Sequence, residues 1–227
     1  MMPAAAPLYP IFLSLQGLTC VVVGFGRVGQ RKLVGLLDCA PAAVLVLDIV
    51  DPSPEAARLL RDPRTRFVRR ALAPCDLRDC ALVFATTNDA AENARIAALC
   101  AEHGVLCNSA TSQGNVLLPA VARCGTMAAA LSTGGSSPAL ARRWKTDLER
   151  WLAPRARMAS FMGRLRPLVL GLNLSSECNA DLFRTIAASP LQDLLETGDR
   201  DASSRLLQGI LPTVLHTKLA ELLDDLP

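Results

Sequence analysis

The sequence predicts an α/β fold built on a parallel sheet, and two observations predict it. Apolar, β-branched runs alternate with helix-like patterns from residue 19 to about residue 110. The first apolar run, residues 19–23, ends at a glycine-rich turn that leads directly into a helical pattern. Strands that alternate with helices are joined by crossover connections, which make the strands parallel and place helices on both faces of the sheet.

The elements of this first part are expected in chain order. Apolar runs predict strands at residues 19–23, 44–48, 66–69, 81–85 and 105–107. Helical patterns predict helices at 27–38, 54–60 and 89–103, with a short turn around 75–79. Asn88 and Asp89 are expected to cap the third helix, because short polar side chains accept hydrogen bonds from the first free N–H groups of a helix.

The pattern changes after Asn108. A turn-rich segment, 111–115, precedes two strand-like runs at 116–123 and 126–132. A helix is expected from about Pro138 to Trp151, because proline is favoured at the first helical position. The remainder, residues 155–227, predicts amphipathic helices broken at Pro167, at Pro190 and at Gly198-Asp199.

Three glycines after the first strand have the spacing G-x-G-x-x-G, at Gly24, Gly26 and Gly29. The first permits a tight turn, the second lets a pyrophosphate approach the backbone, and the third lets the helix pack closely on the sheet. The N–H groups of the following residues, Arg27 and Val28, are expected to face phosphate oxygens. This predicts a Rossmann-type dinucleotide site; a glycine-rich turn without a ligand is the alternative.

Polar residues at the ends of two further strands are the other candidates for cofactor binding. Asp48 ends the second strand, where an acid would bind the adenosine ribose and repel a 2′-phosphate, which favours NAD over NADP. Asp51 is the nearby competitor, and a solvated acid is the alternative interpretation. Thr86 and Thr87 follow the fourth strand and are expected to contact the cofactor, unless they only help to cap the next helix.

Composition excludes several other classes of function. The 227 residues have a net charge of +3 and are 51% hydrophobic, so neither a nucleic acid nor a membrane is expected as a partner. The N-terminus lacks the basic start of a signal peptide, which predicts a cytoplasmic protein. The eight cysteines include no C-x-x-C pair and the two histidines lie far apart, so no metal site is expected and the cysteines are predicted to be reduced and mostly buried.

A family resemblance rests on several short segments in a fixed order. They are Leu8-Tyr-Pro-Ile-Phe-Leu-Ser-Leu-Gln-Gly-Leu18 before the glycine turn, then Phe84-Ala-Thr-Thr-Asn-Asp89, Cys107-Asn108, Leu118-Pro119 and Leu131-Ser-Thr-Gly-Gly-Ser-Ser-Pro-Ala-Leu-Ala-Arg142. Over about residues 8–152 the chain resembles the precorrin-2 dehydrogenase and sirohydrochlorin ferrochelatase family, which forms the dehydrogenase half of siroheme synthase.

The resemblance implies a domain organisation and a reaction. It implies an NAD-binding Rossmann domain in residues 1–112, a strand–helix dimerisation segment in 113–152 and a helical C-terminal region in 153–227, assembled as a homodimer. The implied reaction is the oxidation of precorrin-2, a polycarboxylate tetrapyrrole, to sirohydrochlorin in siroheme biosynthesis, with NAD accepting the hydride.

The candidate catalytic residues are Asn108 and Thr111, at the end of the fifth strand. Bifunctional members of the family have an aspartate where this chain has Thr111. A neutral hydroxyl is a poor base and a weak metal ligand, so metal insertion is expected to be slow or absent and a separate chelatase would be required. A bifunctional dehydrogenase and ferrochelatase, or a non-catalytic regulator that binds NAD or a tetrapyrrole, are the alternatives.

Substrate binding is expected downstream of the sheet. A polycarboxylate needs cations, and Arg142 is the best candidate among the basic residues, because the planar guanidinium matches a carboxylate. Ser132 and Thr133 precede Gly134-Gly135, where backbone N–H groups could bind a carboxylate; a plain turn is the alternative.

Overall fold

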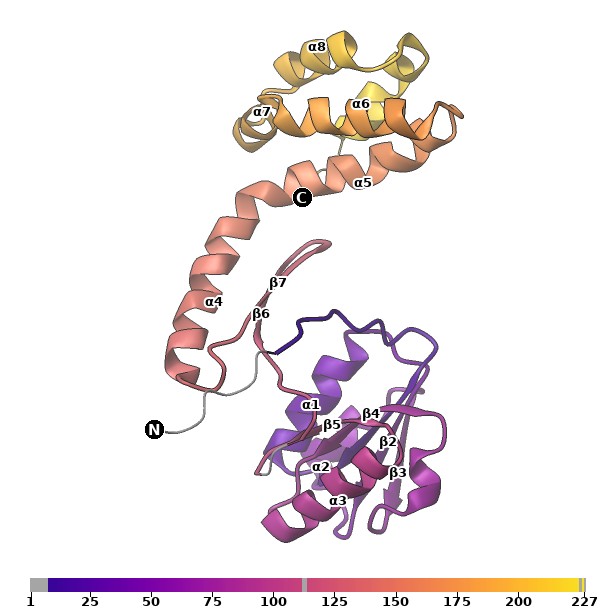
Figure 1. The fold of residues 1–227 in the computed structure, drawn as a ribbon, viewed down its shortest axis with the longest axis vertical. Coiled ribbons are helices and arrows are strands. Elements are labelled where there is room, and N and C mark those ends of the chain that lie inside the picture. The colour runs from indigo at the N-terminus through magenta and orange to yellow at the C-terminus, as the bar shows by residue number, and fades with distance from the viewer. Residues whose placement is uncertain (1–7, 112–113, 225, 227) are drawn as a thin grey trace. The chain divides into compact units, whose positions relative to one another are not determined.

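The computed structural model describes residues 8–111, 114–224 and 226. The chain divides into two compact units, Met1–Leu118 and Pro119–Pro227, and each is described by itself (Figure 1). The first unit contains the parallel sheet, and the second contains a hairpin and helices. Within the described residues, none of the helices has both the length and the apolar character that crossing a membrane would require.

The first unit is a doubly wound α/β unit, as the sequence predicts. Five parallel strands lie in the order β3-β2-β1-β4-β5. The strands are β1 (Thr19–Val23), β2 (Ala43–Asp48), β3 (Thr65–Arg69), β4 (Cys80–Ala85) and β5 (Leu106–Ser109). The helices are α1 (Arg27–Leu37), α2 (Pro54–Leu59) and α3 (Ala90–Glu102), with a short 3-10 turn, η1 (Pro74–Leu77).

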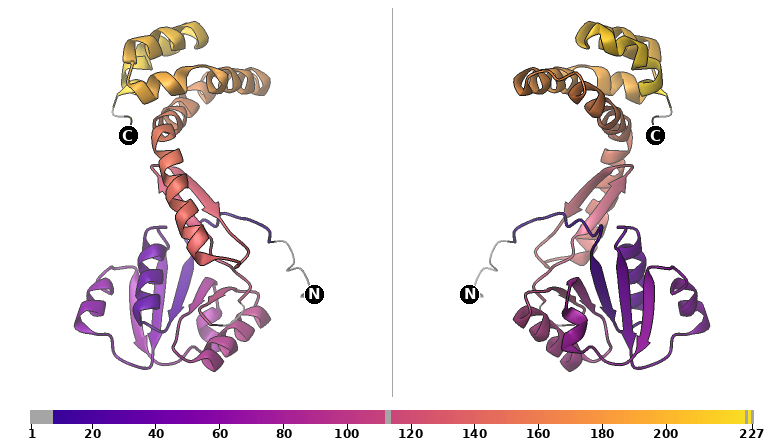
Figure 2. Two further views of the ribbon diagram at one scale, coloured as in Figure 1. Left: turned by 90° about the vertical axis from the view of Figure 1, so that its left-hand side faces the viewer. Right: turned by 90° about the vertical axis from the view of Figure 1, so that its right-hand side faces the viewer.

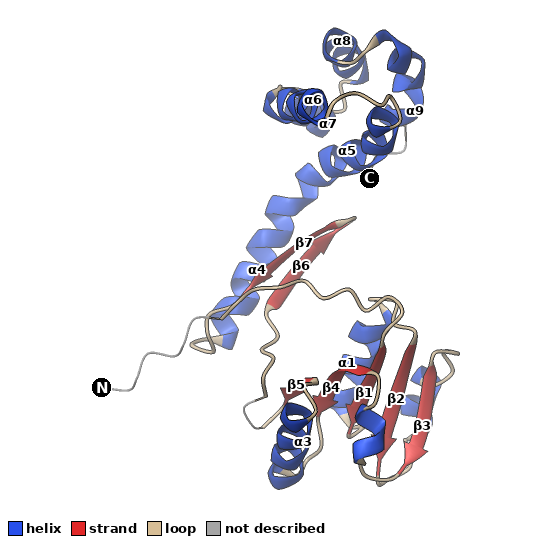
Figure 3. Cartoon of the chain, turned by 45° about the vertical axis from the view of Figure 1, so that its right-hand side comes forward, coloured by secondary structure: helices blue, strands red, loops and turns tan. Residues whose placement is uncertain are grey.

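Each face of the sheet has its own apolar core, because successive side chains of a strand point to opposite faces. Val21 and Val23 pack on the face that α3 and η1 cover. Cys20 and Val22 pack on the opposite face, under α1 and α2. Figure 3 shows α3 and α1 on opposite sides of the sheet. Burial on both faces explains the continuous apolar run in β1.

Local sequence signals position the helix starts. Asp89 caps α3, since its Oδ1 accepts hydrogen bonds from the N–H groups of Ala91 and Glu92. Ser53 caps α2 through the N–H of Ala56. These caps satisfy donors that would otherwise be unpaired at the first turn.

The second unit begins with an antiparallel hairpin. Strands β6 (Ala120–Cys124) and β7 (Met127–Leu131) pair with each other, and helix α4 (Pro138–Leu152) packs against both. The first predicted strand of this hairpin begins later than expected, at Ala120 rather than at residue 116. Pro119 cannot donate a ladder hydrogen bond, and the preceding Val116 hydrogen-bonds back to Cys107 instead.

The C-terminal part of this unit is helical, as predicted (Figure 2). Its elements are η2 (Ala153–Arg155), α5 (Ala156–Leu170), α6 (Ser176–Ala188), α7 (Leu191–Thr197), α8 (Arg200–Ile210), η3 (Thr213–Lys218) and α9 (Leu219–Leu223). Helices α5 to α9 and η3 share one apolar core, which includes Phe161, Leu165, Ile186, Leu191 and Leu207.

One predicted break is wrong. Pro190 and Gly198 do separate helices, and Gly198 has a φ of +76° that suits glycine. Pro167, however, lies inside α5. The ring removes one backbone hydrogen bond there, but Phe161, Leu165 and Val169 on the same helix are fully buried. Burial of this apolar face stabilises the helix through a proline that local propensity disfavours.

Candidate functional site

The candidate site lies where the direction of the sheet winding reverses. β1 has β2 on one side and β4 on the other. The three strands are parallel, so their carboxyl ends lie at the same edge of the sheet. Ligands of open α/β sheets bind at this edge, at the switch point. A cavity of about 690 Å³ opens here, and Gly24, Gly26, Asp48, Thr86 and Thr87 are among the residues that line it.

Two of the three motif glycines are required by the fold itself. Gly24 has a φ of +87°, and a Cβ there would lie 2.6 Å from the backbone nitrogen of Thr87. A Cβ on Gly29 would lie 2.0 Å from the carbonyl oxygen of Gly24, so α1 could not pack as closely on the turn. Both contacts involve backbone atoms, which cannot move aside easily.

Gly26 differs from its neighbours in the motif. Among the residues that the structure describes, a Cβ at this position would meet no atom within 4 Å, and no side chain caps the N-terminus of α1, which begins at the next residue. The space beside Gly26 is therefore open to a ligand, and the first N–H groups of the helix, at Arg27 and Val28, are available to it. The residues present fit a dinucleotide pyrophosphate.

Asp48 is tied to the glycine turn by hydrogen bonds. Its Oδ2 accepts from the N–H of Phe25 at 2.5 Å, and its Oδ1 accepts from the N–H of Val50 at 3.1 Å. The carboxylate lines the cavity and remains able to accept further hydrogen bonds. Asp51, the competitor, forms an ion pair with Arg69 at 2.8 Å instead.

The Thr86 hydroxyl hydrogen-bonds to backbone carbonyls of the protein itself. The side chain is 6% exposed, and Oγ1 lies 3.0 Å from the carbonyl oxygen of Val23 and 2.8 Å from that of Gly24. The hydroxyl thus donates to carbonyls that end β1 and begin the turn. Its predicted role as a cofactor contact stays a prediction, and the hydrogen bonds give it a definite structural role.

Sequence reasoning missed Asn93, a fully buried residue of α3. Its Oδ1 accepts from the backbone N–H of Thr87 at 3.0 Å and from the Thr87 hydroxyl at 2.8 Å. Its Nδ2 donates to the carbonyl of Thr87 at 3.0 Å and to Oγ1 of Thr111 at 2.9 Å. A signal did exist, because Asn93 shares its helix face with Ile96 and Cys100, where an apolar residue is the norm.

The two predicted catalytic residues lie in different surroundings. Asn108 pairs with Phe84 in the sheet, on the face under α1, and its Nδ2 donates to the carbonyl of Val116 at 3.0 Å. Thr111 instead hydrogen-bonds to α3 through Asn93. The amide of Asn108 therefore holds the loop after β5, whereas the Thr111 hydroxyl belongs to the polar cluster at the carboxyl end of β4.

Basic side chains at the cavity rim are held by acids. Arg70 forms an ion pair with Asp76 at 2.6 Å, and its guanidinium holds the pKa of that carboxyl below its ordinary value. Arg95 pairs with Glu92 at 2.7 Å and lowers its pKa in the same way. These pairs give the rim both signs of charge.

Four of the eight cysteines are buried, namely Cys20, Cys80, Cys100 and Cys107, which is half of them and not, as the sequence predicted, most of them. Burial raises the pKa of Cys20 to about 12 and that of Cys80 to about 11. Such thiols stay protonated and pack as small hydrophobic side chains.

The residues predicted to bind substrate lie in the second unit. Ser132 Oγ accepts from the N–H of Gly134 at 3.1 Å, and Thr133 Oγ1 accepts from the N–H of Ser137 at 3.2 Å. These bonds organise the turn before α4, and the predicted substrate-binding role of both residues stays a prediction. Arg142 is exposed on α4, with its Nε 3.4 Å from the carbonyl of Pro138.

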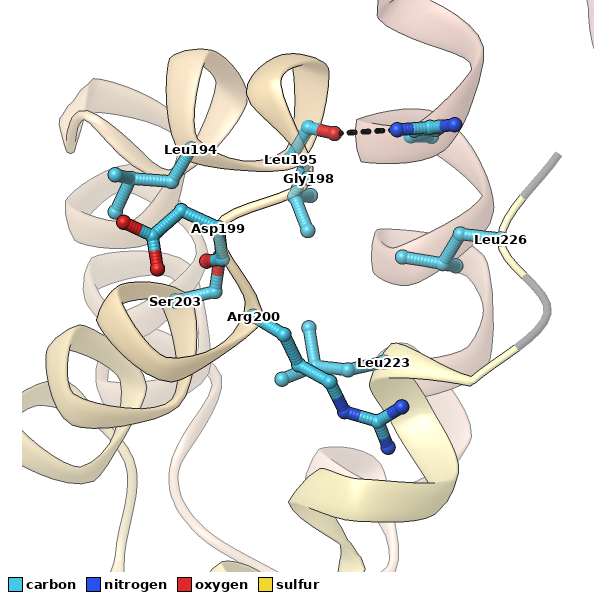
Figure 4. A pocket seen from close by; sticks show the side chains of 9 residues that line it. Leu194, Leu195, Gly198, Asp199, Arg200, Ser203, Leu223 and Leu226 are labelled. Atoms are coloured by element: carbon cyan, nitrogen blue, oxygen red, sulfur yellow. Dashed lines mark hydrogen bonds between the residues drawn. The ribbon is translucent and has the colours of Figure 1, made fainter.

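A second, smaller pocket of about 190 Å³ lies among the C-terminal helices (Figure 4). Arg157 donates from there to the carbonyl of Leu195 at 2.9 Å, and Arg200 pairs with Asp224 at 2.5 Å. Both guanidinium groups therefore hold neighbouring helices together.

Comparison with known proteins agrees with this geometry. Residues 11–120 match a sequence family described as "Putative NAD(P)-binding". The chain is 31% identical over 217 residues to a protein of Azotobacter vinelandii named siroheme synthase, covering 93% of this chain and 46% of that protein. Proteins of the same name from Pseudomonas putida and Thioalkalivibrio sulfidiphilus are 30% and 31% identical, over 89% and 92% of this chain.

The chain thus spans less than half the length of these relatives. Among solved structures, the one titled "SirC, precorrin-2 dehydrogenase" has the same fold, with a TM-score of 0.69 and 24% identity. The match covers 96% of this chain and 99% of that one, so the likeness in fold extends to the helical C-terminal region.

Proposed function

We propose that this chain is an NAD-dependent dehydrogenase. Residues 11–120 match an NAD(P)-binding family, and the chain is similar to siroheme synthases along most of its own length. Its substrate in this proposal is precorrin-2 and its product is sirohydrochlorin. The observation that carries the proposal is the cavity at the switch point, where Gly26 leaves room for a pyrophosphate in a chain with these relatives.

In the proposal, residues of the first unit bind and orient the cofactor, which accepts a hydride when it is bound. The N-terminus of α1 binds the pyrophosphate through the N–H groups of Arg27 and Val28. Asp48 accepts hydrogen bonds from the ribose hydroxyls, and its negative charge disfavours a 2′-phosphate, so NAD is preferred to NADP. Thr87 borders the cavity on the side of β4.

The proposal does not include efficient metal insertion. Thr111 has a neutral hydroxyl, which can neither remove a pyrrole proton efficiently at neutral pH nor bind a dication tightly. A separate chelatase would then convert the product. This part of the proposal rests on the residue at position 111 and on the family resemblance.

We also propose a homodimer formed through residues 113–152. The described strands of this segment form a sheet of only two strands, and such a pair is marginal by itself. Helix α4 exposes large apolar side chains, among them Trp151 at 53%. A second copy of the chain would cover them. Sedimentation at micromolar concentration should give the dimer mass; an active monomer would contradict this part.

The dehydrogenase proposal is tested by supplying precorrin-2 and NAD to the purified protein anaerobically. NADH and sirohydrochlorin should appear together in equal amounts, and the Gly26→Val variant should produce neither. Binding of NAD without turnover would instead favour a non-catalytic regulator.

Metal insertion is tested separately, with sirohydrochlorin and ferrous or cobalt ion. The absorbance should change no faster than in a control without protein. Clearly faster insertion would establish the bifunctional alternative and contradict the interpretation of Thr111.

A further inference from the structure

The orientation of the Asn93 side chain is determined by its partners. The backbone nitrogen of Thr87 can only donate, so the atom 3.0 Å from it must be Oδ1. The carbonyl of Thr87 can only accept, so the atom 3.0 Å from it must be Nδ2. Two opposite requirements from one residue leave no freedom to exchange the amide oxygen and nitrogen.

This orientation determines whether the Thr111 hydroxyl donates or accepts in its hydrogen bond with Asn93. Nδ2 of Asn93 lies 2.9 Å from Oγ1 of Thr111 and must donate to it. Oγ1 is therefore an acceptor in this bond, and its own hydrogen points elsewhere. Within residues 8–111 and 114–224, this hydroxyl donates no hydrogen bond.

The amide itself has no donor left for another partner, because the two hydrogens of Nδ2 go to Thr87 and Thr111. Oδ1 accepts from the N–H of Thr87 and lies 2.8 Å from the Thr87 hydroxyl, whose single hydrogen is shared with the carbonyl of Asp89 at 3.0 Å. Asn93 has no exposed surface, so it does not reach a ligand. A buried polar group with all its bonds made holds its partners in one arrangement.

We propose that Asn93 is a positioning residue that makes the Thr111 hydroxyl a hydrogen-bond donor to a carboxylate of the substrate. The inference rests on the proposed function, because a tetrapyrrole polycarboxylate supplies the acceptor. A hydroxyl that already accepts from Asn93 complements an anion, since its remaining hydrogen is available to a carboxylate oxygen. The inference gives Thr111 a binding role, distinct from that of a catalytic base or a metal ligand.

The first test separates substrate binding from cofactor binding. Thr111→Val should raise the KM for precorrin-2 by roughly 10- to 100-fold, the effect of losing one hydrogen bond to a charged group, and leave the KM for NAD unchanged. Thr111→Ser retains the donor and should stay within about threefold of the wild type. Thr197→Val, which removes an exposed hydroxyl from α7, is the matched control.

The second test separates positioning from a purely structural role. In Asn93→Asp an acceptor replaces the Nδ2 donor, so the Thr111 hydroxyl would turn inward to donate to it. KM for precorrin-2 should rise at neutral pH and fall again as acid protonates the buried carboxyl. In the Thr111→Val background, Asn93→Asp should raise this KM no further, although its cost in thermal stability remains.

Equilibrium binding of sirohydrochlorin to the same variants gives a readout that needs no turnover. The affinities should follow the KM values for precorrin-2. An unchanged KM in Thr111→Val, a changed KM for NAD instead, or additive effects in the double variant would overturn the inference. A wild-type protein that binds NAD but does not oxidise precorrin-2 would overturn the proposed function itself.

Discussion

The carboxylate of Asp48 at the end of β2 accepts a hydrogen bond from the backbone N–H of Phe25, with Oδ2 and the nitrogen 2.5 Å apart. Phe25 lies between the first two glycines of the turn after β1, so one side chain both lines the cofactor cavity and braces the turn that shapes it. A substitution at Asp48 should therefore affect stability as well as cofactor choice.

Asp48→Ala should weaken NAD binding more than NADP binding and also destabilise the protein by about 1–3 kcal/mol, because the Phe25 N–H loses its acceptor. Asp48→Asn keeps one acceptor oxygen but loses the charge, so it should restore much of the stability while raising NADP affinity relative to NAD. Calorimetric titration with both cofactors and urea unfolding measure these effects. Unchanged NAD affinity in Asp48→Ala would exclude the assigned ribose site.

Gly26→Val should abolish NAD binding without unfolding the protein. In the described part of the chain no atom lies within 4 Å of a Cβ at this position, so the side chain would fill the space predicted for the pyrophosphate. Gly35→Ala, inside α1, is the control, since its Cβ would also meet no atom of the described residues within 4 Å. It should bind NAD normally and gain roughly 0.5–1 kcal/mol from helix propensity. Thermal unfolding and NAD titration of both variants test the assignment.

Gly29→Ala should destabilise the fold, in contrast to Gly26→Val, which should abolish NAD binding without unfolding the protein. The added Cβ would lie 2.0 Å from the carbonyl oxygen of Gly24, so α1 or the turn would have to shift. We expect a cost of roughly 1–3 kcal/mol, as for other overpacked sites. Urea unfolding measures it, and a stability equal to that of the wild type would show that the turn can relax at no cost.

Acid should weaken the ion pair between Asp62 and Arg64, whose closest charged atoms are 2.8 Å apart. Hydrogen bonds from Arg64 lower the pKa of Asp62 from its ordinary 3.8 to about 2. A lowered pKa means that the pair stabilises the fold fully above pH 3.8 and that this contribution is lost as the pH falls towards 2. Unfolding measured across this window should depend on pH less steeply in Asp62→Asn; an identical pH dependence would exclude the pair as a contributor.

Sequence alone determined those features that depend on neighbouring residues. The apolar run of β1 and the helical pattern after Gly29 predicted the parallel sheet, because side chains near in sequence report directly which faces are buried. The spacing of the three glycines predicted the turn, and Asp89 predicted the cap of α3. Each signal lies within a few residues of the element it specifies.

Only the tertiary structure decided which distant polar groups meet. Asn93 on α3 joins Thr87, in the loop after β4, to Thr111, in the loop after β5, and nothing in the sequence around any one of them specifies the other two. Pro167 continues a helix because residues far along the chain bury its apolar face. Hydrogen bonds and packing between distant segments depend on where the whole chain places them, and for this reason the sequence predicted the elements around the site but not the bonds between them.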